Sequence, residues 1–347
     1  MSQKALLLDS KFGSFKVATI PRPTSALAGE ILIKVHASAL NPVDWKVRDW
    51  AVFLPDEENY PAVLGLDVAG EVEDVGEGVT GFKKGDRVFY DGGFKNEYAG
   101  HQQYCRAPAK FVAKIPEKFS YSQASTIPTG FLTAAYGLCA DAPLGVGLNP
   151  TFDDIKEKFQ EKNALVIGGS TSVGQYVIQV LRYLGFPTII VYASAHQFPY
   201  LKTFGATDLI DRKAVPFSDL DTAVKKVTSS PIDVVYDTIS LVDSQAAGYK
   251  LLPNGGKMVI TVEDEIKDKV EGKELVHVFG NVHPEDHKEF GVTLFSKLPK
   301  LLEDEIIVPN KVEDLPGGLD GIVEGLRRLK NNEVSGIKLV SHPNETA

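Results

Sequence analysis

The sequence predicts an α/β protein of two domains, a partly closed β-barrel and a doubly wound parallel sheet. Its 347 residues are too many for one simple core and suit two domains. The first third contains short strand patterns broken by glycine and proline, which is typical of a small barrel. From Tyr121 onward strands alternate with helices, and this alternation indicates a parallel sheet with helices on both faces.

The barrel prediction depends on three stretches of the first third. Residues 30–42 begin with alternating side chains and stop at an Asn-Pro pair, residues 67–89 place valines among turn glycines, and residues 101–116 repeat a strand-and-turn pattern. Because each stretch is short and is interrupted by turn residues, it predicts barrel strands rather than helices.

The parallel sheet is predicted from short apolar runs that are separated by helical patterns. The run 165–169 is apolar without alternation, as a central parallel strand should be. The expected strands span about residues 164–169, 188–193, 207–210, 232–237, 256–262 and 275–281, and the expected helices include 196–204 and 243–251.

The strand–helix alternation is lost near Phe290. From about residue 293 the sequence holds two helical patterns, 294–304 and 318–332, and closes with a short strand pattern at 337–340. We therefore expect a barrel domain formed by residues 1–124 and 293–347 and a dinucleotide domain formed by residues 125–292.

One candidate insertion, residues 141–163, combines a glycine-rich loop with a charged segment. Phe152, Ile155 and Phe159 fall at helical spacing, so we expect an amphipathic helix that docks one face on the protein. The loop glycines favour movement over a substrate, and a passive surface insertion is the alternative.

Composition excludes several classes of protein. No apolar run reaches the roughly 18 residues that span a bilayer, and the N-terminus is too weakly apolar for a signal peptide. Two cysteines, Cys105 and Cys139, cannot make a disulfide framework, so a cytoplasmic location is expected. The net charge of −9 opposes binding to nucleic acid or anionic membranes. We expect a monomer or homodimer acting on a small molecule.

A glycine-rich turn joins the first strand of the parallel sheet to the helix that follows it. Glycines let backbone amides approach an anion closely, and the helix N-terminus adds favourable partial charge. The spacing is not a clean G-x-G-x-x-G, so a tight turn without a ligand remains the alternative. The residues predicted to hold the pyrophosphate of a dinucleotide are Gly168, Gly169, Ser170, Thr171, Ser172, Val173 and Gly174, with Ser170 or Thr171 as the N-cap.

The residues after the second strand of the sheet favour NADPH over NADH. An NAD-binding protein usually has an acid there for the ribose 2′-hydroxyl, but residues 162–207 contain no Asp or Glu. Hydroxyl and cationic side chains would instead bind a 2′-phosphate. The candidates near the expected position are Ser194, His196, Tyr200, Lys202 and Arg212, each of which could alternatively be an ordinary surface residue.

Across nearly its full length the chain resembles the medium-chain dehydrogenase/reductase superfamily. The motifs that carry the resemblance occur in the family's order, and the longest is the most specific. Two of them, NPVDWK and VSGIKLV, point to the fungal enoyl-reductase and quinone-oxidoreductase-like branch. The motifs are NPVDWK at 41–46, LGLDVAGEVEDVGEGVTGFKKGDRV at 64–88, FVAKIP at 111–116, STIPTGFLTAAYGL at 125–138, ALVIGGSTSVGQYVIQ at 164–179 and EVSGIKLV at 333–340. The resemblance implies a GroES-like barrel and a Rossmann NADP(H)-binding domain.

The resemblance also implies that no metal takes part. Zinc-using members place a Cys near Val43 or Asp44 and a His-Glu pair near Leu66 and Asp67, and this chain has neither. Asp67 is expected only to make hydrogen bonds within the barrel. His101 with Cys105 is the one local alternative, but on a strand these residues are too far apart for easy joint ligation.

Without a metal, the chemistry depends on the cofactor and on hydrogen-bond donors. Hydride addition to a conjugated carbonyl suits such a site, because a donor can stabilise the enolate oxygen. By the resemblance, the candidate catalytic residues are Asn41, Lys46, Thr129 and Tyr60, and Lys338 approaches the cofactor; Tyr60 and Lys46 could alternatively be a lining aromatic and a solvated lysine.

We therefore expect NADPH-dependent reduction of an activated double bond or a quinone. The alternatives are aldehyde reduction, for which Lys46 or another donor would replace zinc, and a regulatory partner that binds NADPH without useful turnover.

Overall fold

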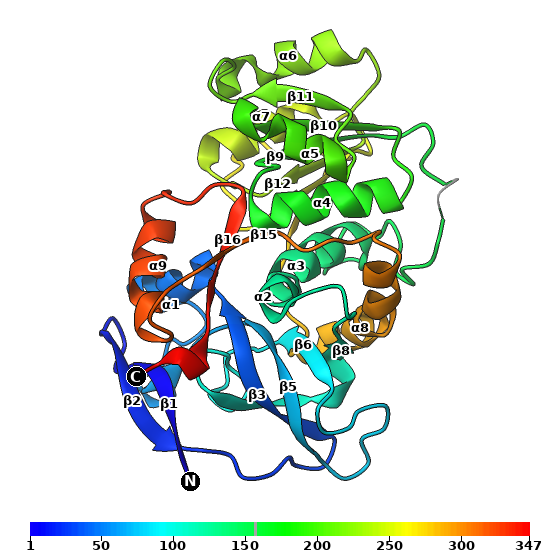
Figure 1. The fold of residues 1–347 in the computed structure, drawn as a ribbon. Helices are drawn as coiled ribbons and strands as arrows, with labels where there is room; N and C mark the ends of the chain where they lie inside the picture. Colours follow the sequence, from blue (N-terminus) through cyan, green and yellow to red (C-terminus); the bar gives the residue numbers. More distant parts are fainter. Residues whose placement is uncertain (156–157) are drawn as a thin grey trace. The chain divides into compact units, whose positions relative to one another are not determined.

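The computed structural model describes residues 1–155 and 158–347. They form two compact units, one made of Met1–Thr129 with Asn281–Ala347 and the other of Gly130–Gly280. In Figure 1 the first unit carries the blue-to-cyan and orange-to-red segments, and the second carries the green-to-yellow ones.

The structure divides the chain at slightly different places from those expected at 124 and 293. The stretch after Gly280 contacts the first unit, because the Val282 amide donates to Asp91 Oδ2 at 3.3 Å and the His283 ring stacks on Tyr98. At the other boundary, the Thr129 amide donates to Asp67 Oδ1 at 2.6 Å. Such contacts depend on tertiary packing, which local sequence patterns do not report.

The first unit is built on a seven-stranded sheet in which β3 is central. This strand pairs antiparallel with β5, β7 and β16, and a separate three-stranded sheet has the order β2-β1-β4. Valine and isoleucine side chains of the larger sheet, including Ile33, Val68 and Val88, form its core. The strands of the two sheets are β1 (Ser2–Leu8), β2 (Phe15–Pro21), β3 (Glu30–Ala39), β4 (Ala62–Val63), β5 (Asp67–Val75), β6 (Arg87–Asp91), β7 (Tyr104–Pro108), β8 (Val112–Lys114), β15 (Lys311–Asp314) and β16 (Ile337–Ser341).

Helices pack around these sheets in the same unit. The two helical patterns expected after residue 293 are present as α8 and α9, and the expected final strand is β16. Leu319, Ile322 and Leu326 of the α9 region pack with Leu40 and Leu339, which ties the C-terminal segment to the N-terminal one. The helices are α1 (Pro42–Trp50), α2 (Tyr121–Ser125), α8 (Lys288–Glu303) and α9 (Asp320–Lys330), while α3 (Pro128–Cys139) begins in this unit and continues into the second.

The second unit is a six-stranded parallel sheet with the order β11-β10-β9-β12-β13-β14. The strand order reverses beside β9, as in a doubly wound sheet that binds a dinucleotide. All six strands fall close to the predicted ranges, so this part of the sequence prediction is confirmed. They are β9 (Asn163–Ile167), β10 (Thr188–Ala193), β11 (Asp208–Asp211), β12 (Val234–Asp237), β13 (Lys257–Ile260) and β14 (Glu274–His277).

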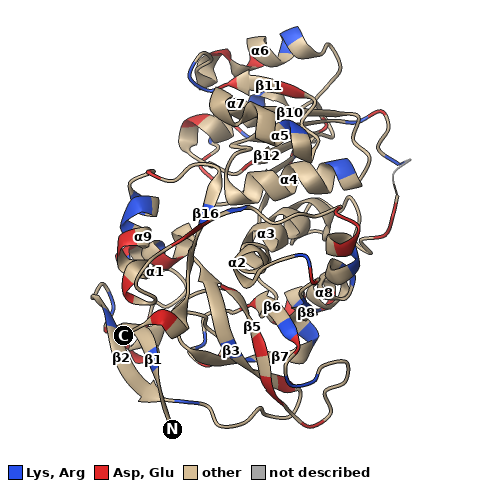
Figure 2. Cartoon of the chain, in the orientation of Figure 1, with Lys and Arg blue, Asp and Glu red and all other residues tan. Residues whose placement is uncertain are grey.

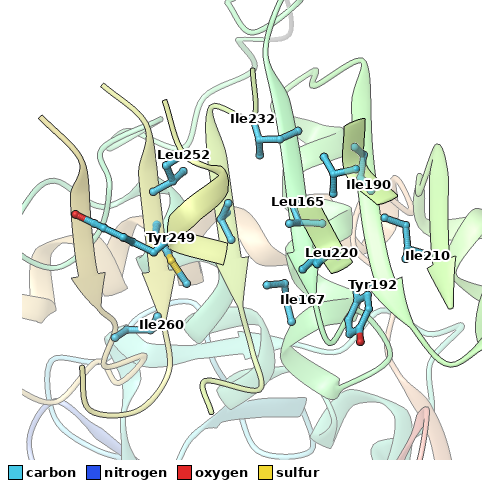
Figure 3. Packing of buried hydrophobic residues seen from close by; sticks show 13 residues of the cluster. Leu165, Ile167, Ile190, Tyr192, Ile210, Leu220, Ile232, Tyr249, Leu252 and Ile260 are labelled. Atoms are coloured by element: carbon cyan, nitrogen blue, oxygen red, sulfur yellow. The ribbon is translucent and has the colours of Figure 1, made fainter. Parts of the chain in front are cut away.

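Helices of this unit cover both faces of its sheet. Alternate residues such as Leu165 and Ile190 face a cluster that contains Leu220, Val224 and Tyr249 from the α6 and α7 regions, and Figure 3 shows this cluster. Successive residues of a strand point to opposite faces, so the intervening residues face the other side, where α4 lies. The helices are α4 (Ser172–Tyr183), α5 (Phe198–Phe204), α6 (Leu220–Val227) and α7 (Val242–Leu251).

The prediction of a helix in the insertion 141–163 is wrong for the residues that the structure describes. Lys156 and Glu157, which belong to the same prediction, lie outside the described residues. No helix occurs in 151–155 or 158–162. Phe152 has a φ of +52°, which a right-handed helix does not allow. In place of helical hydrogen bonds, Asn149 Nδ2 donates to the Asp153 carbonyl and Asn149 Oδ1 accepts the Asp153 amide. Phe152 is nevertheless buried, stacked on Tyr183.

Figure 2 shows positions of Lys or Arg and positions of Asp or Glu interspersed along the described chain. Within the described part of the chain, no helix has both the length and the apolarity needed to cross a membrane.

Candidate active site

The glycine-rich turn lies at the carboxyl end of β9 in the second unit. Gly168 has a φ of +80°, and a Cβ on Gly174 would lie 2.4 Å from the carbonyl oxygen of Gly168. Thr171 is the N-cap of α4, since its Oγ1 accepts the Gly174 amide at 2.9 Å; of the two expected caps, the structure selects this one. The first amides of a helix have no intrahelical acceptor, so this backbone fits a dinucleotide pyrophosphate.

The residues expected to select the cofactor lie after β10 and β11. Arg212 Nε donates to Ser194 Oγ at 2.6 Å, so the structure brings these two residues together. Ser194 is buried and Arg212 is exposed, with no carboxylate partner for its guanidinium among the described residues. The fork of guanidinium N–H groups can therefore approach a phosphate from the solvent side.

Three other candidates lie on the segment that follows Ser194. His196 is exposed beside Gln197, and the Tyr200 ring packs on Phe204. Lys202, in α5, is exposed. No contact among the described residues joins them to Arg212, so their role at the cofactor stays a prediction.

Sequence reasoning missed one acid at this end of the sheet. Asp211 Oδ1 accepts the amides of Ala195 at 3.3 Å and of Lys213 at 3.0 Å. An acid that binds the ribose is expected directly after the second strand, β10, whereas Asp211 ends the neighbouring strand β11. Because its Oδ1 is bonded to these amides, the carboxylate orders the turn that carries Arg212.

A cluster of polar side chains, which we call the Asp67 cluster, lies in the first unit, and all of them are buried except Thr129, which is half-buried. It consists of Asn41, Asp44, Asp67, Thr129 and Lys338. Asp67 Oδ2 lies 2.8 Å from Lys338 Nζ and accepts Asn41 Nδ2 at 2.9 Å. Lys338 Nζ also donates to Asn41 Oδ1 at 2.5 Å. Asn41 Nδ2 further lies 3.5 Å from Thr129 Oγ1.

Four separate segments supply this cluster. Asn41 precedes α1 and Asp67 begins β5, while Lys338 lies on β16 and Thr129 begins α3. The sheet register aligns them, because Ala39 of β3 pairs with Asp67 on one side and with Val340 on the other. Lys338 and Val340 are two residues apart and therefore point to the same face.

Asp44 is a buried member of the cluster whose pKa is raised. Its carboxyl group is fully buried and accepts the Asn41 amide at 2.8 Å. Burial raises the pKa of Asp44 to about 7. The hydrogen bond from the Asn41 amide lowers this pKa in part, and the nearby charges of Asp67 and Lys338 have smaller, opposite effects. The cluster thus holds an acid that titrates near neutral pH.

Two predicted catalytic residues have other surroundings. Lys46 Nζ lies 5.4 Å from the centroid of the Trp50 ring and 5.9 Å from that of Trp45, and burial lowers the pKa of Lys46. Tyr60 donates its hydroxyl to the Leu54 carbonyl at 2.9 Å. No contact among the described residues joins Lys46 or Tyr60 to Asp67, so their catalytic roles stay predictions.

The donor set does not fit zinc. Among the described residues no three His, Cys, Asp or Glu side chains are grouped to hold a metal ion. Asp67 is paired with a lysine ammonium, which excludes a cation from the same position by charge. The alternative pair of His101 and Cys105 also fits zinc poorly, because burial raises the pKa of the Cys105 thiol to about 12 and Cys105 Sγ lies 2.7 Å from the Tyr90 hydroxyl, whereas zinc binds the thiolate.

Comparison with known proteins agrees with this architecture. The chain matches the family model of the alcohol dehydrogenase GroES-like domain over residues 27–117 and that of the zinc-binding dehydrogenase over residues 172–278. Together with the parallel sheet, these matches confirm the predicted GroES-like and Rossmann domain types. A Rossmann-type dehydrogenase domain implies a nicotinamide dinucleotide cofactor.

Relatives cover nearly the whole chain. A zinc-type alcohol dehydrogenase-like protein of Schizosaccharomyces pombe is 30% identical over 97% of this chain and 99% of its own length. A trans-enoyl reductase of Alternaria alternata is 32% identical over 98% of both chains. The solved quinone oxidoreductase of Coxiella burnetii is 25% identical, with a TM-score of 0.72 over 98% of this chain and 99% of that one. The chain therefore belongs to the medium-chain dehydrogenase/reductase superfamily, in its enoyl-reductase-like branch, and is an oxidoreductase.

Proposed function

We propose that the chain catalyses zinc-independent transfer of hydride from NADPH to an activated double bond, in an enone or enoyl substrate, or to a quinone. The observation that carries this proposal is the Asp67–Lys338 ion pair. By the resemblance, Asp67 stands where metal-dependent members of the superfamily have a zinc ligand. A reaction at such a site must proceed without a Lewis acid, and conjugate reduction meets this condition because its negative charge can be stabilised by hydrogen-bond donors.

The choice of NADPH is supported by the Ser194–Arg212 contact. The cradle at Gly168–Gly174 would bind the pyrophosphate, which NADPH and NADH share. Discrimination must therefore come from the adenosine ribose, where a guanidinium and a hydroxyl favour a 2′-phosphate.

The backbone at Gly168–Gly174 would hold the cofactor, and NADPH bound there would supply the hydride that reduces the β-carbon of the substrate. In our proposal Thr129 and Lys46 donate hydrogen bonds to the carbonyl oxygen as negative charge develops on it. Asn41 Nδ2 donates to Thr129 Oγ1 at 3.5 Å, and we propose that Tyr60 lines the substrate site. A side chain or water then protonates the α-carbon.

The printed names of relatives agree with this reaction class. They include a trans-enoyl reductase of Aspergillus flavipes, 28% identical, and the enoyl reductase component of the lovastatin nonaketide synthase of Aspergillus terreus, also 28% identical. These names describe those proteins, and for this chain they support the type of reaction without naming its substrate.

A substrate panel tests the proposal. Purified protein is mixed with NADPH and with enals, enones, quinones and saturated aldehydes, and loss of absorbance of the reduced cofactor is followed. We expect turnover of conjugated acceptors and none of saturated aldehydes. Turnover restricted to saturated aldehydes would favour carbonyl reduction instead, and tight NADPH binding without any turnover would favour a regulatory binding protein.

A further inference from the structure

We propose that Lys338 is a positioning residue for the reaction: its ammonium is the built-in cation of the active site, and it holds Thr129 in place through Asp67 and Asn41. This inference rests on the proposed function. It gives Lys338 a different role from the cofactor contact that the sequence resemblance implies.

The burial of Lys338 is the first observation. Its side chain is 4% exposed and that of Asp67 is 0% exposed. A lysine is almost never buried this far without a partner, because an ammonium loses strong hydration there. The register of β16 against β3 and of β3 against β5 brings the two charges together, so the fold itself places the cation.

The orientation of the Asn41 amide is the second observation. Lys338 has only donors, so the Asn41 atom that faces it must be the oxygen Oδ1. This fixes Asn41 Nδ2 on the opposite side, where it donates to Asp67 Oδ2 at 2.9 Å and lies 3.5 Å from Thr129 Oγ1. Without the ammonium, the amide could turn over and would present an oxygen to the carboxylate.

The contacts of Asp67 complete the connection to Thr129. Asp67 Oδ2 binds the lysine and the asparagine, while Oδ1 accepts the backbone amide of Thr129 at 2.6 Å. Both the backbone and the hydroxyl of Thr129 are therefore linked to groups that Lys338 holds. A shift of these groups would move the hydroxyl that we propose as a donor to the substrate.

Stability alone does not account for this arrangement. Replacing both members of a buried ion pair with neutral residues is often neutral or stabilising, whereas removing one member is costly. If the ion pair were purely structural, both residues could therefore be replaced together without loss of kcat. If the pair positions a catalytic donor, replacing both residues should lower kcat.

The test compares three variants. Lys338→Met leaves Asp67 buried without its cation, so we expect a lowered midpoint of urea unfolding. In Lys338→Met with Asp67→Asn, we expect the midpoint and the NADPH dissociation constant to return close to wild type. We expect its kcat on an enone to stay about 10- to 100-fold low, with KM little changed. Lys114→Met is the control, because it removes an exposed lysine paired with Asp86 and should change none of these values.

Recovery of wild-type kcat in the double variant would overturn the proposal, and so would a double variant that is no more stable to urea than Lys338→Met. If the double variant does not fold, Lys338→Arg and Lys338→Gln decide: the arginine variant should keep more kcat than the glutamine variant, and equal losses would contradict the role of the charge. If wild type turns over no member of the substrate panel, the proposed function fails, whereas urea unfolding of the same variants still measures the Asp67–Lys338 ion pair.

Discussion

Asp44 is a buried carboxylic acid whose pKa lies close to neutral pH. Burial raises that pKa from 3.8 to about 7. Between these values the folded protein keeps a proton that the unfolded chain releases. The free energy of unfolding therefore falls as the pH rises through this range.

Substituting Asp44 with Asn should remove this dependence, because the amide oxygen can still accept the Asn41 amide but carries no charge. The stability of wild type relative to Asp44→Asn should decline between pH 4 and pH 7, by up to ~4 kcal/mol, and stay level above about pH 8. Urea unfolding of both proteins across this range measures the difference. If the unfolding free energies of the two proteins changed in parallel with pH, Asp44 would be ionised in the folded protein throughout this range.

Arg212 should distinguish the two nicotinamide cofactors. Because its guanidinium lies against Ser194 at 2.6 Å, Arg212→Ala should weaken NADPH binding by about 10- to 100-fold and leave NADH nearly unchanged. Ser194→Asp should invert the preference by repelling the 2′-phosphate. Fluorescence titration with each cofactor measures this, and Lys213→Ala is a neighbouring control. An equal loss of both cofactors in Arg212→Ala would refute the assignment.

At this scale the sequence identified residue types better than contacts. Asn41, Thr129 and Lys338 were chosen by resemblance, and the structure brings them together. Asp67 was expected only to make hydrogen bonds, but it also forms an ion pair with Lys338. That pair joins segments far apart in the chain, and only the register of the sheet brings them into contact.

Among the elements, the turn between β9 and α4 has little room for added atoms. A Cβ on Gly174 would meet Gly168 O at 2.4 Å and Gly169 Cα at 2.7 Å, and both are backbone atoms. Gly174→Ala should therefore shift the turn, cost about 1–3 kcal/mol of stability and weaken NADPH and NADH equally. Thermal unfolding and titration with both cofactors measure this. Arg182→Ala, at an exposed position of the same helix, is the control. If Gly174→Ala kept the stability and the cofactor affinities of wild type, the packing argument would be contradicted.

Sequence patterns predicted regular elements well and irregular ones poorly. The strands of the parallel sheet were recognised because they are short apolar runs between turn residues, as at β9 and β10. The insertion 141–163 was assigned a helix because its aromatic residues have helical spacing. Its described residues bury Phe152 and Phe159 by ring stacking instead, on Tyr183 and Phe186. Periodicity reports which side chains are apolar and does not report the side-chain hydrogen bonds of Asn149 that compete with a helix.

For the whole molecule, the succession of a barrel-like part, a strand–helix part and a returning C-terminal segment could be predicted because each part has its own periodicity. The exact divisions at Thr129 and Asn281 could not, because they depend on contacts of Asp67 and Asp91. The zinc independence that we propose is likewise a property of the whole protein, since metal ligands would have to converge from several segments.

The central claim is that hydride transfer from NADPH proceeds here without zinc. The most direct test measures the rate of NADPH oxidation on an enone before and after dialysis against a chelator, with the zinc content of the same samples determined by elemental analysis. Because the Asp67 cluster already contains the Lys338 ammonium, we expect no stoichiometric zinc and an unchanged rate. Stoichiometric zinc in the active protein, with a rate that is lost on chelation and restored by added zinc, would contradict the account.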